Sequence, residues 1–199
     1  GAGTMGNGIA QACAVAGIHV VMVDISDAAV AKGLATVGGS LDRLLKKEKI
    51  SAADKDAAMA RIRTSTRYDD LKSAQLVIEA ATENFDLKVR ILKQVDALVA
   101  PDVIVATNTS SISITKLAAV TSRADRFIGM HFFNPVPMMA LVEIIRGLQT
   151  SDATHDAVHA MAKVLGKTPI TVKNAPGFVV NRILVPMINE AFFVLAEGL

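Results

Sequence analysis

The sequence predicts an α/β fold, with a doubly wound and largely parallel sheet covered by helices on both faces. Short β-branched segments alternate along the chain with segments of helical period, which is typical of parallel strands joined by helices. A glycine-rich segment opens the chain and leads directly into the first helical segment. After Pro176 and Gly177 the alternation stops, and one long apolar helical segment predicts the start of an all-helical C-terminal domain.

The individual elements are expected in a regular order. Ser51 and Asp54 match a capping box, which predicts the start of a helix at residues 51–63. This helix and the one before it, at residues 27–49, are expected to form a helical hairpin. We expect residues 1–174 to form one domain that lacks its first strand, and residues 175–199 to be the truncated start of the helical domain. Strands are expected at residues 19–23, 75–81, 103–106, 127–132, 140–145 and 168–172, and helices at 9–16, 27–49, 51–63, 87–99, 114–120, 153–165 and 179–195.

Composition argues against several classes of protein. Hydrophobic residues make up 51% and charged residues 20% of the chain, and no apolar run reaches the roughly 18 residues of a membrane span. We therefore expect a soluble protein that does not bind membranes. Lys and Arg exceed Asp and Glu only by 21 to 19, and aromatic residues make up 4%, which argues against nucleic-acid binding. The single cysteine, Cys13, and the lack of a secretion signal predict a cytoplasmic location.

The opening segment, residues 1–6, matches the pattern GxGxxG and leads into a helix. In such a loop the glycines permit a tight turn and let the backbone approach a pyrophosphate, while the helix N-terminus faces the anion with free N–H groups. A flexible glycine turn would explain the same residues. The candidate cofactor contacts in this loop are Gly1, Gly3, Thr4, Met5 and Gly6.

Asp24 supplies a second feature of a dinucleotide site. It ends the next expected strand about twenty residues after the loop, where a carboxylate can accept hydrogen bonds from the adenosine ribose. No Lys or Arg follows it before Lys32, so its charge should repel the additional phosphate of NADP. The loop and Asp24 together predict a Rossmann-type domain with NAD as the cofactor.

Four separated motifs indicate which kind of NAD-dependent protein this is. They are Asn-Thr-Ser-Ser at 108–111, His-Phe-Phe-Asn-Pro-Val-Pro at 131–137, Leu-Val-Glu at 141–143 and Pro-Gly-Phe-Val-Val-Asn-Arg at 176–182. In order and spacing, over essentially the whole chain, they resemble the L-3-hydroxyacyl-CoA dehydrogenases, most closely the bacterial 3-hydroxybutyryl-CoA dehydrogenases. The resemblance implies NAD-dependent interconversion of (S)-3-hydroxyacyl-CoA and 3-oxoacyl-CoA in fatty-acid metabolism, by a full-length homodimer. A related hydroxyacid or sugar-nucleotide dehydrogenase and an inactive NAD-binding module are the alternatives.

His131 and Glu143 are the candidate acid–base pair. Oxidation of a secondary alcohol by hydride transfer needs a base for the hydroxyl proton and a partner that orients this base. A histidine at the end of an apolar strand is more often a core residue than a catalyst. However, a carboxylate on the next apolar strand is out of place unless it is paired. A neighbouring strand, parallel or antiparallel, would let Glu143 hold one ring nitrogen of His131 and stabilise the imidazolium.

Three further polar residues are substrate or cofactor candidates. Ser110 follows an expected strand end, and its alternative role is a turn or N-cap. By resemblance it hydrogen-bonds the substrate 3-oxygen, and Asn108 lies nearer the cofactor. Asn181 caps the last helix on one interpretation and orients the substrate on the other, which the resemblance favours.

Other residues have weaker assignments. Asn134 lies either in a simple turn or near the nicotinamide, and Glu83 and Lys88 either contact the nicotinamide ribose or carboxamide or form a solvated helix start. Lys46 and Lys47 could bind coenzyme A phosphates, together with Arg43 and Lys49, or form a solvated helix face. His155 and His159 are one helical turn apart, but no carboxylate completes a metal motif, so we expect no metal.

Overall fold

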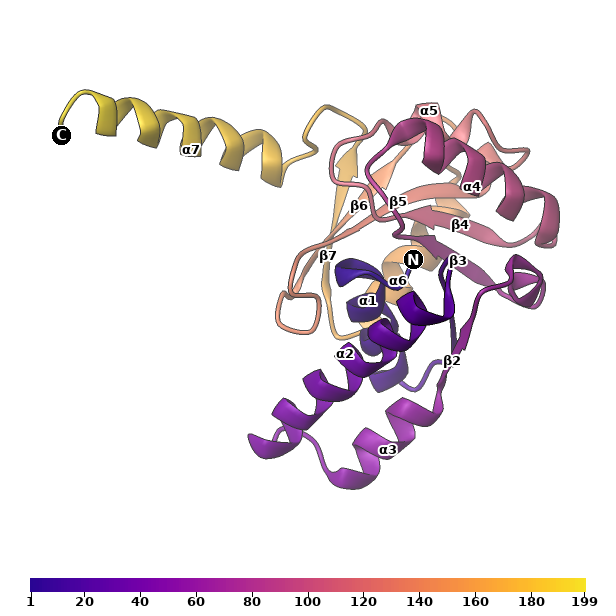
Figure 1. The fold of residues 1–199 in the computed structure, drawn as a ribbon. Coiled ribbons are helices and arrows are strands. Elements are labelled where there is room, and N and C mark those ends of the chain that lie inside the picture. The colour runs from indigo at the N-terminus through magenta and orange to yellow at the C-terminus, as the bar shows by residue number, and fades with distance from the viewer.

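The structure is a computed structural model that describes residues 1–199 (Figure 1). Two short 3₁₀ helices, η1 (Tyr68–Leu71) and η2 (Ala124–Arg126), accompany the regular elements. The strands are β1 (Val20–Val23), β2 (Ile62–Ser65), β3 (Leu76–Glu79), β4 (Ile104–Thr107), β5 (Phe127–Phe132), β6 (Leu141–Arg146) and β7 (Thr168–Lys173). The helices are α1 (Thr4–Val15), α2 (Asp27–Lys46), α3 (Ala52–Ala60), α4 (Phe85–Leu98), α5 (Ile114–Ala118), α6 (Asp152–Val164) and α7 (Val180–Ala196).

The strands form two sheets. A five-stranded sheet has the order β3-β4-β5-β6-β7, in which only the β5–β6 pair is antiparallel. Strands β1 and β2 form a separate parallel pair. Helices α4 and α5 cover one face of the large sheet, and α1 and α6 cover the other (Figure 1). The predicted α/β fold, with a largely parallel sheet and helices on both faces, is confirmed.

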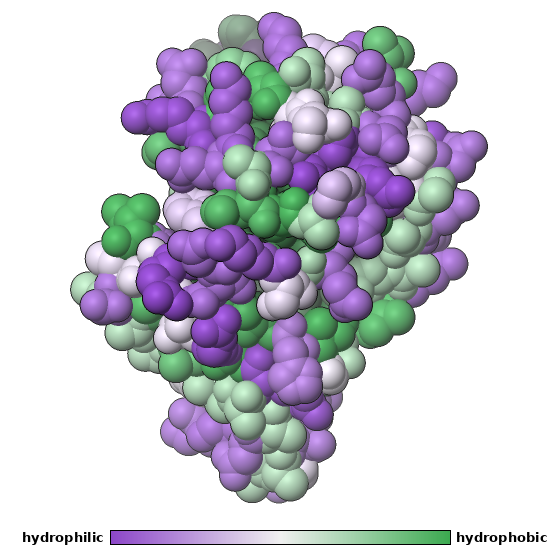
Figure 2. Space-filling view, turned by 90° about the vertical axis from the view of Figure 1, so that its right-hand side faces the viewer, coloured by the Kyte–Doolittle hydropathy of each residue, from purple (hydrophilic) through white to green (hydrophobic).

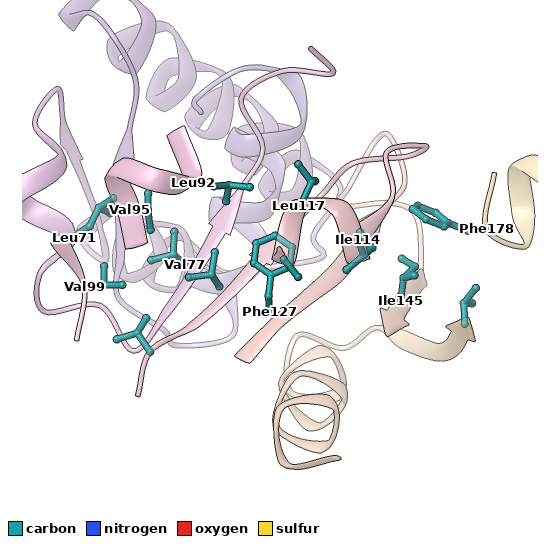
Figure 3. Close-up of a cluster of buried hydrophobic side chains, with 14 residues drawn as sticks. Leu71, Val77, Leu92, Val95, Val99, Ile114, Leu117, Phe127, Ile145 and Phe178 are labelled. Carbon is teal, nitrogen blue, oxygen red and sulfur yellow. The ribbon is translucent and has the colours of Figure 1, made fainter. Parts of the chain in front are cut away.

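Alternation along β5 explains why the sheet is covered on both sides. The side chain of Phe127 joins the cluster beneath α4 and α5, whereas that of Ile128 joins the cluster beneath α1 and α6. In Figure 3 the first cluster runs from Leu71 and Val99 past Phe127, and Phe178 extends it beyond Ile145. Every residue of β5 is buried, as a central strand requires.

Helix starts follow the expected capping chemistry. Ser51 and Asp54 form the predicted capping box at the start of α3. Ser26, Asn84 and Ser151 each accept a hydrogen bond from a backbone N–H in the first turn of α2, α4 and α6. The hairpin of α2 and α3 packs on α1 and the β1–β2 pair and thereby lies beside the glycine loop.

One element was predicted wrongly. The helix expected at 51–63 ends at Ala60, and Ile62–Ser65 instead forms β2, which pairs in parallel with β1. Only Ile62 of this strand is buried, and the three residues that follow it are polar, so its sequence carries little apolar alternation. The first helix also begins earlier than expected, at Thr4, directly on the glycine loop.

Helix α7 differs from the rest of the molecule. It projects from the body (Figure 1), contains no buried residue and has Pro186 in its interior. Its apolar side chains are exposed, among them Ile183 and Phe192 at 65% and 66%. The face of the molecule in Figure 2, by contrast, is largely hydrophilic, with apolar side chains showing between polar ones. None of the helices combines the length and apolar character that crossing a membrane requires.

Candidate active site

The glycine loop shows how the backbone forms one wall of a cleft. A Cβ atom added to Gly6 would lie 1.8 Å from the carbonyl oxygen of Gly1, so this position cannot carry a side chain. At Gly3 an added Cβ would meet nothing within 4 Å, so this glycine faces open space. Gly3 is the N-cap of α1 and provides no side-chain cap, which leaves the first N–H groups of the helix available to an anion.

The neighbouring residues of the loop have different roles. Thr4 lines the cleft, whereas the side chain of Met5 packs against the core, so only its backbone can serve a ligand. Gly1 packs on the peptide of Ala80, because an added Cβ would lie 2.6 Å from the oxygen of that residue. A Cβ atom added to Gly33 of α2 would likewise lie 2.7 Å from the carbonyl oxygen of Ala2, a close approach that the sequence analysis missed.

Asp24 lies at the end of β1 and lines the same cleft. Its Oδ2 accepts a hydrogen bond from the N–H of Ala2 at 2.6 Å, and its Oδ1 accepts one from the N–H of Ile25 at 2.7 Å. Burial raises the pKa of this carboxyl, but the two backbone donors outweigh the burial and the pKa lies below its usual value. Asp24 therefore remains an anion that is tied to the loop.

The cleft has a volume of about 690 Å³ and brings together three segments. The glycine loop and Asp24 form one side, and the β5–β6 loop from Asn134 to Met138 forms another. At the third side are basic residues near the end of α2, namely Arg43, Lys47 and Lys49. Lys46 does not line the cleft. The open cradle at Gly3, the helix N-terminus and Asp24 fit a dinucleotide with a pyrophosphate and an unphosphorylated ribose.

His131 and Glu143 face each other on β5 and β6. These strands are antiparallel and place the two residues directly opposite each other. Nδ1 of His131 lies 2.7 Å from Oε2 of Glu143, and the two residues are 6% and 0% exposed. The imidazole also lies against Phe133 and Phe178, with ring centroids 4.4 and 5.8 Å away. The structure thus contains a buried, hydrogen-bonded His–Glu pair, and Nε2 of His131 has no hydrogen-bond partner.

The second oxygen of Glu143 has partners that the sequence analysis missed. Oε1 accepts hydrogen bonds from the N–H groups of Val179 and Val180, at 2.9 and 3.0 Å, where α7 begins. The turn before them has left-handed backbone at Gly177 (φ 73°) and Phe178 (φ 49°). The carboxylate of Glu143 therefore orients His131 and also binds two of the backbone N–H groups that lack partners within α7.

Ser110 is held through its backbone from two directions. Its N–H donates to Oε1 of Glu83 at 2.8 Å, and its carbonyl accepts from Nδ2 of Asn181 at 3.4 Å. The suggestion that Asn181 caps α7 is wrong, because Val179 is the N-cap. Asn108 is buried, and its Oδ1 accepts from the N–H of Phe132, which ties the ends of β4 and β5 together.

Lys88 is not part of a solvated helix start, so this alternative is wrong. Only 1% of its surface is exposed, and its Nζ donates to Oε2 of Glu79 at 2.6 Å. The hydroxyl of Thr107 donates to the same oxygen at 2.7 Å. Glu83 is exposed and accepts from the hydroxyl of Thr109 in addition to the Ser110 N–H.

The remaining candidates lie in two places. Asn134 is exposed, precedes a cis peptide bond to Pro135 and lines the cleft. The ring of His155 lies within hydrogen-bond distance of Asp156 and Thr171, through Nδ1 and Nε2. His155 and His159 on α6 therefore do not offer two free imidazoles.

The sequence matches a family model over most of its length. Residues 1–175 match "3-hydroxyacyl-CoA dehydrogenase, NAD binding domain". The 3-hydroxybutyryl-CoA dehydrogenases of Bradyrhizobium diazoefficiens and Clostridioides difficile are 48% and 47% identical to it over 198 residues. Both alignments cover the whole chain, which spans 68% and 70% of these relatives.

Solved structures give the same result. The crystal structure of (S)-3-hydroxybutyryl-CoA dehydrogenase from Ralstonia eutropha is 78% identical, with a TM-score of 0.98, and is covered over 70% of its chain. A 3-hydroxybutyryl-CoA dehydrogenase from Escherichia coli K12 is 36% identical with a TM-score of 0.96, covering 99% of this chain and 42% of that one. The chain therefore belongs to the 3-hydroxyacyl-CoA dehydrogenase family, and its residues 1–175 match the family's NAD-binding domain.

Proposed function

We propose that this protein oxidises (S)-3-hydroxyacyl-CoA to 3-oxoacyl-CoA with NAD, and catalyses the reverse reduction, with short chains such as 3-hydroxybutyryl-CoA as substrate. The observation that carries the proposal is the hydrogen bond between Nδ1 of His131 and Oε2 of Glu143, buried at the end of the sheet where the cleft lies. A related protein named as a fatty acid oxidation complex subunit, from Acinetobacter baylyi, is 43% identical and supports a role in fatty-acid metabolism.

His131 serves as the base for the hydroxyl proton. The carboxylate of Glu143 accepts hydrogen bonds from two backbone N–H groups through its other oxygen, so both of its oxygens are engaged. Because an ionised carboxylate can only accept, the ring proton belongs on Nδ1, and the lone pair of Nε2 is free. As His131 takes up the substrate proton on Nε2, the negative charge of Glu143 stabilises the imidazolium. Bound NAD supplies the hydride acceptor.

Ser110 and Asn181 position the reacting carbon. With its backbone held by Glu83 and Asn181, Ser110 can direct its hydroxyl to the 3-oxygen of the substrate. Phe133 and Phe178 lie beside the imidazole and reduce the access of water to it. Asn108 and Asn134 border the nicotinamide side of the site. Glu83 and Lys88 lie near the end of β3, where Lys88 binds Glu79.

The cleft accommodates the charged parts of both ligands. The glycine loop and Asp24 hold the adenosine half of NAD. Arg43, Lys47 and Lys49 offer positive charge to the phosphates of coenzyme A, with Lys46 on the same helix. We further propose that the full-length protein is a cytoplasmic homodimer.

The test compares His131→Ala with His19→Ala, an exposed histidine, in the full-length protein. With (S)-3-hydroxybutyryl-CoA and NAD, kcat should fall by more than about a hundredfold for His131→Ala, because general acid–base catalysis is typically worth that much. The His19→Ala control should retain its rate. NADH affinity should be unchanged in both variants, as measured by fluorescence titration.

The outcomes separate the alternatives. An inactive NAD-binding module would bind NADH without turnover in the parent protein. A sugar-nucleotide dehydrogenase would turn over its own substrates and leave acyl-CoA untouched. Near-normal turnover of His131→Ala would restore the interpretation of His131 as an ordinary core histidine.

A further inference from the structure

The loop between β5 and β6 forms a wall of the cleft but is not part of the sheet. Its residues from Asn134 to Met138 all line the cleft. A tight turn closes the loop, because the N–H groups of Met138 and Met139 both donate to the carbonyl of Pro135, at 2.9 and 3.0 Å. The carbonyls of residues 136–139 accept no backbone hydrogen bond.

Lys167 binds two of those carbonyls. Its Nζ lies 2.5 Å from the oxygen of Val136 and 2.9 Å from that of Met139. The lysine directly follows Gly166, whose positive φ of 70° turns the chain at the end of α6. Lys167 is half-buried, and this burial lowers its pKa.

An apolar contact holds the same loop from its other side. Val136 is 2% exposed and belongs to the core cluster beneath α1. It packs on Gly8, where an added Cβ would lie 2.9 Å from the Cβ of Val136. Since Gly8 lies two residues after the glycine loop, the position of Val136 sets the distance between the two walls of the cleft.

We propose that Lys167 is a positioning residue that holds the 134–139 loop against α1 and thereby fixes the width of the cofactor cleft. This inference rests on the proposed function for the identity of the ligand, NAD. The contact itself does not depend on that identity. Lys167 does not line the cleft, and its hydrogen bonds go to the loop, so it acts through the loop that it binds.

The test replaces Lys167 by Met, which keeps an unbranched side chain of nearly the same length but removes the donors. Amide hydrogen exchange at Met138 and Met139 should accelerate by about tenfold, because their turn loses its outer support. The Kd for NADH should rise by about tenfold. Lys163→Met, on the exposed side of α6, is the matched control and should change neither quantity. Lys167→Arg should retain most of the affinity, since guanidinium can donate to two carbonyls.

The readouts distinguish the two proposals. Unchanged exchange at Met138 and Met139 in Lys167→Met would overturn the positioning role. Should that variant not fold, Lys167→Gln provides the same measurement, and again unchanged exchange would overturn the role. If exchange accelerates but the parent protein does not bind NADH, the proposed function fails and the role of Lys167 in holding the loop stands. Faster exchange with unchanged NADH affinity would refute the effect on the cleft.

Discussion

The cleft beside the glycine loop and the His131–Glu143 pair lie near the same end of the sheet but are built from different contacts. The glycine-loop wall of the cleft is an open surface of backbone, where Gly3 leaves space and Gly6 permits two peptides to touch. The His131–Glu143 pair is a closed arrangement of side chains, in which each carboxylate oxygen of Glu143 has a donor. The glycine-loop wall thus depends on the absence of side chains, and the pair depends on complete hydrogen bonding.

This difference predicts different consequences of substitution. An added methyl group in the glycine loop excludes a ligand or displaces the backbone, and it should change binding. Loss of one hydrogen-bonding group in the buried pair leaves another group without a partner, which should change the rate and the stability. Substitutions in the two regions should therefore separate KM effects from kcat effects.

The largest effect is expected within the cleft, where two glycines can be compared. Gly6→Ala places a methyl group against the oxygen of Gly1, so the loop must move. We expect NADH affinity to fall by at least about a hundredfold, together with a lower melting temperature. Gly3→Ala meets no protein atom, so it should weaken NADH binding by about tenfold without loss of stability. Equal melting temperatures for the two variants would contradict this reading of the loop.

The second prediction concerns the closed pair. Gln at position 143 has one oxygen and one NH₂ group, so it cannot accept from both His131 and the N–H groups at the start of α7. We expect Glu143→Gln to lower kcat by about thirtyfold and to lower the melting temperature, with unchanged NADH affinity. Glu190→Gln, on the exposed surface of α7, is the control and should have no effect on any of the three quantities.

The parts of the site that could be predicted from sequence are those that have their own residue types. The glycine loop, Asp24 and the carboxylate opposite His131 each depend on a particular residue type at a particular position. A sequence shows such residues directly. The parts that were missed are bonds to backbone. The contacts of Lys167 with two carbonyls and of Glu143 with two N–H groups require no particular residue at the backbone partner.

The same reasoning explains the errors in the fold and at Lys88. Strand β2 is short and half-exposed, so its sequence resembles the end of the preceding helix, and only its pairing with β1 defines it. The burial of Lys88 depends on Glu79, which lies nine residues earlier on another element. A charged pair of this kind becomes evident only when the strand end and the helix are placed together.

The smallest effect is expected at Asp24, whose charged side chain lies beside the glycine loop in the cleft. Because its pKa lies below the usual value, the carboxyl remains ionised from pH 7 down to about pH 5. Its charge should therefore repel the 2′-phosphate of NADP throughout this range, and we expect a preference for NAD of at least about tenfold, or roughly 1.4 kcal/mol.

In Asp24→Ser the preference should nearly vanish, mainly through tighter binding of NADP, as measured by kcat/KM with each cofactor. Asp27→Ser, on the exposed first turn of α2 and outside the cleft lining, should keep the parent ratio. If the parent used both cofactors equally, Asp24 would serve only as an acceptor for the N–H groups of Ala2 and Ile25, and its charge would play no part in the choice of cofactor.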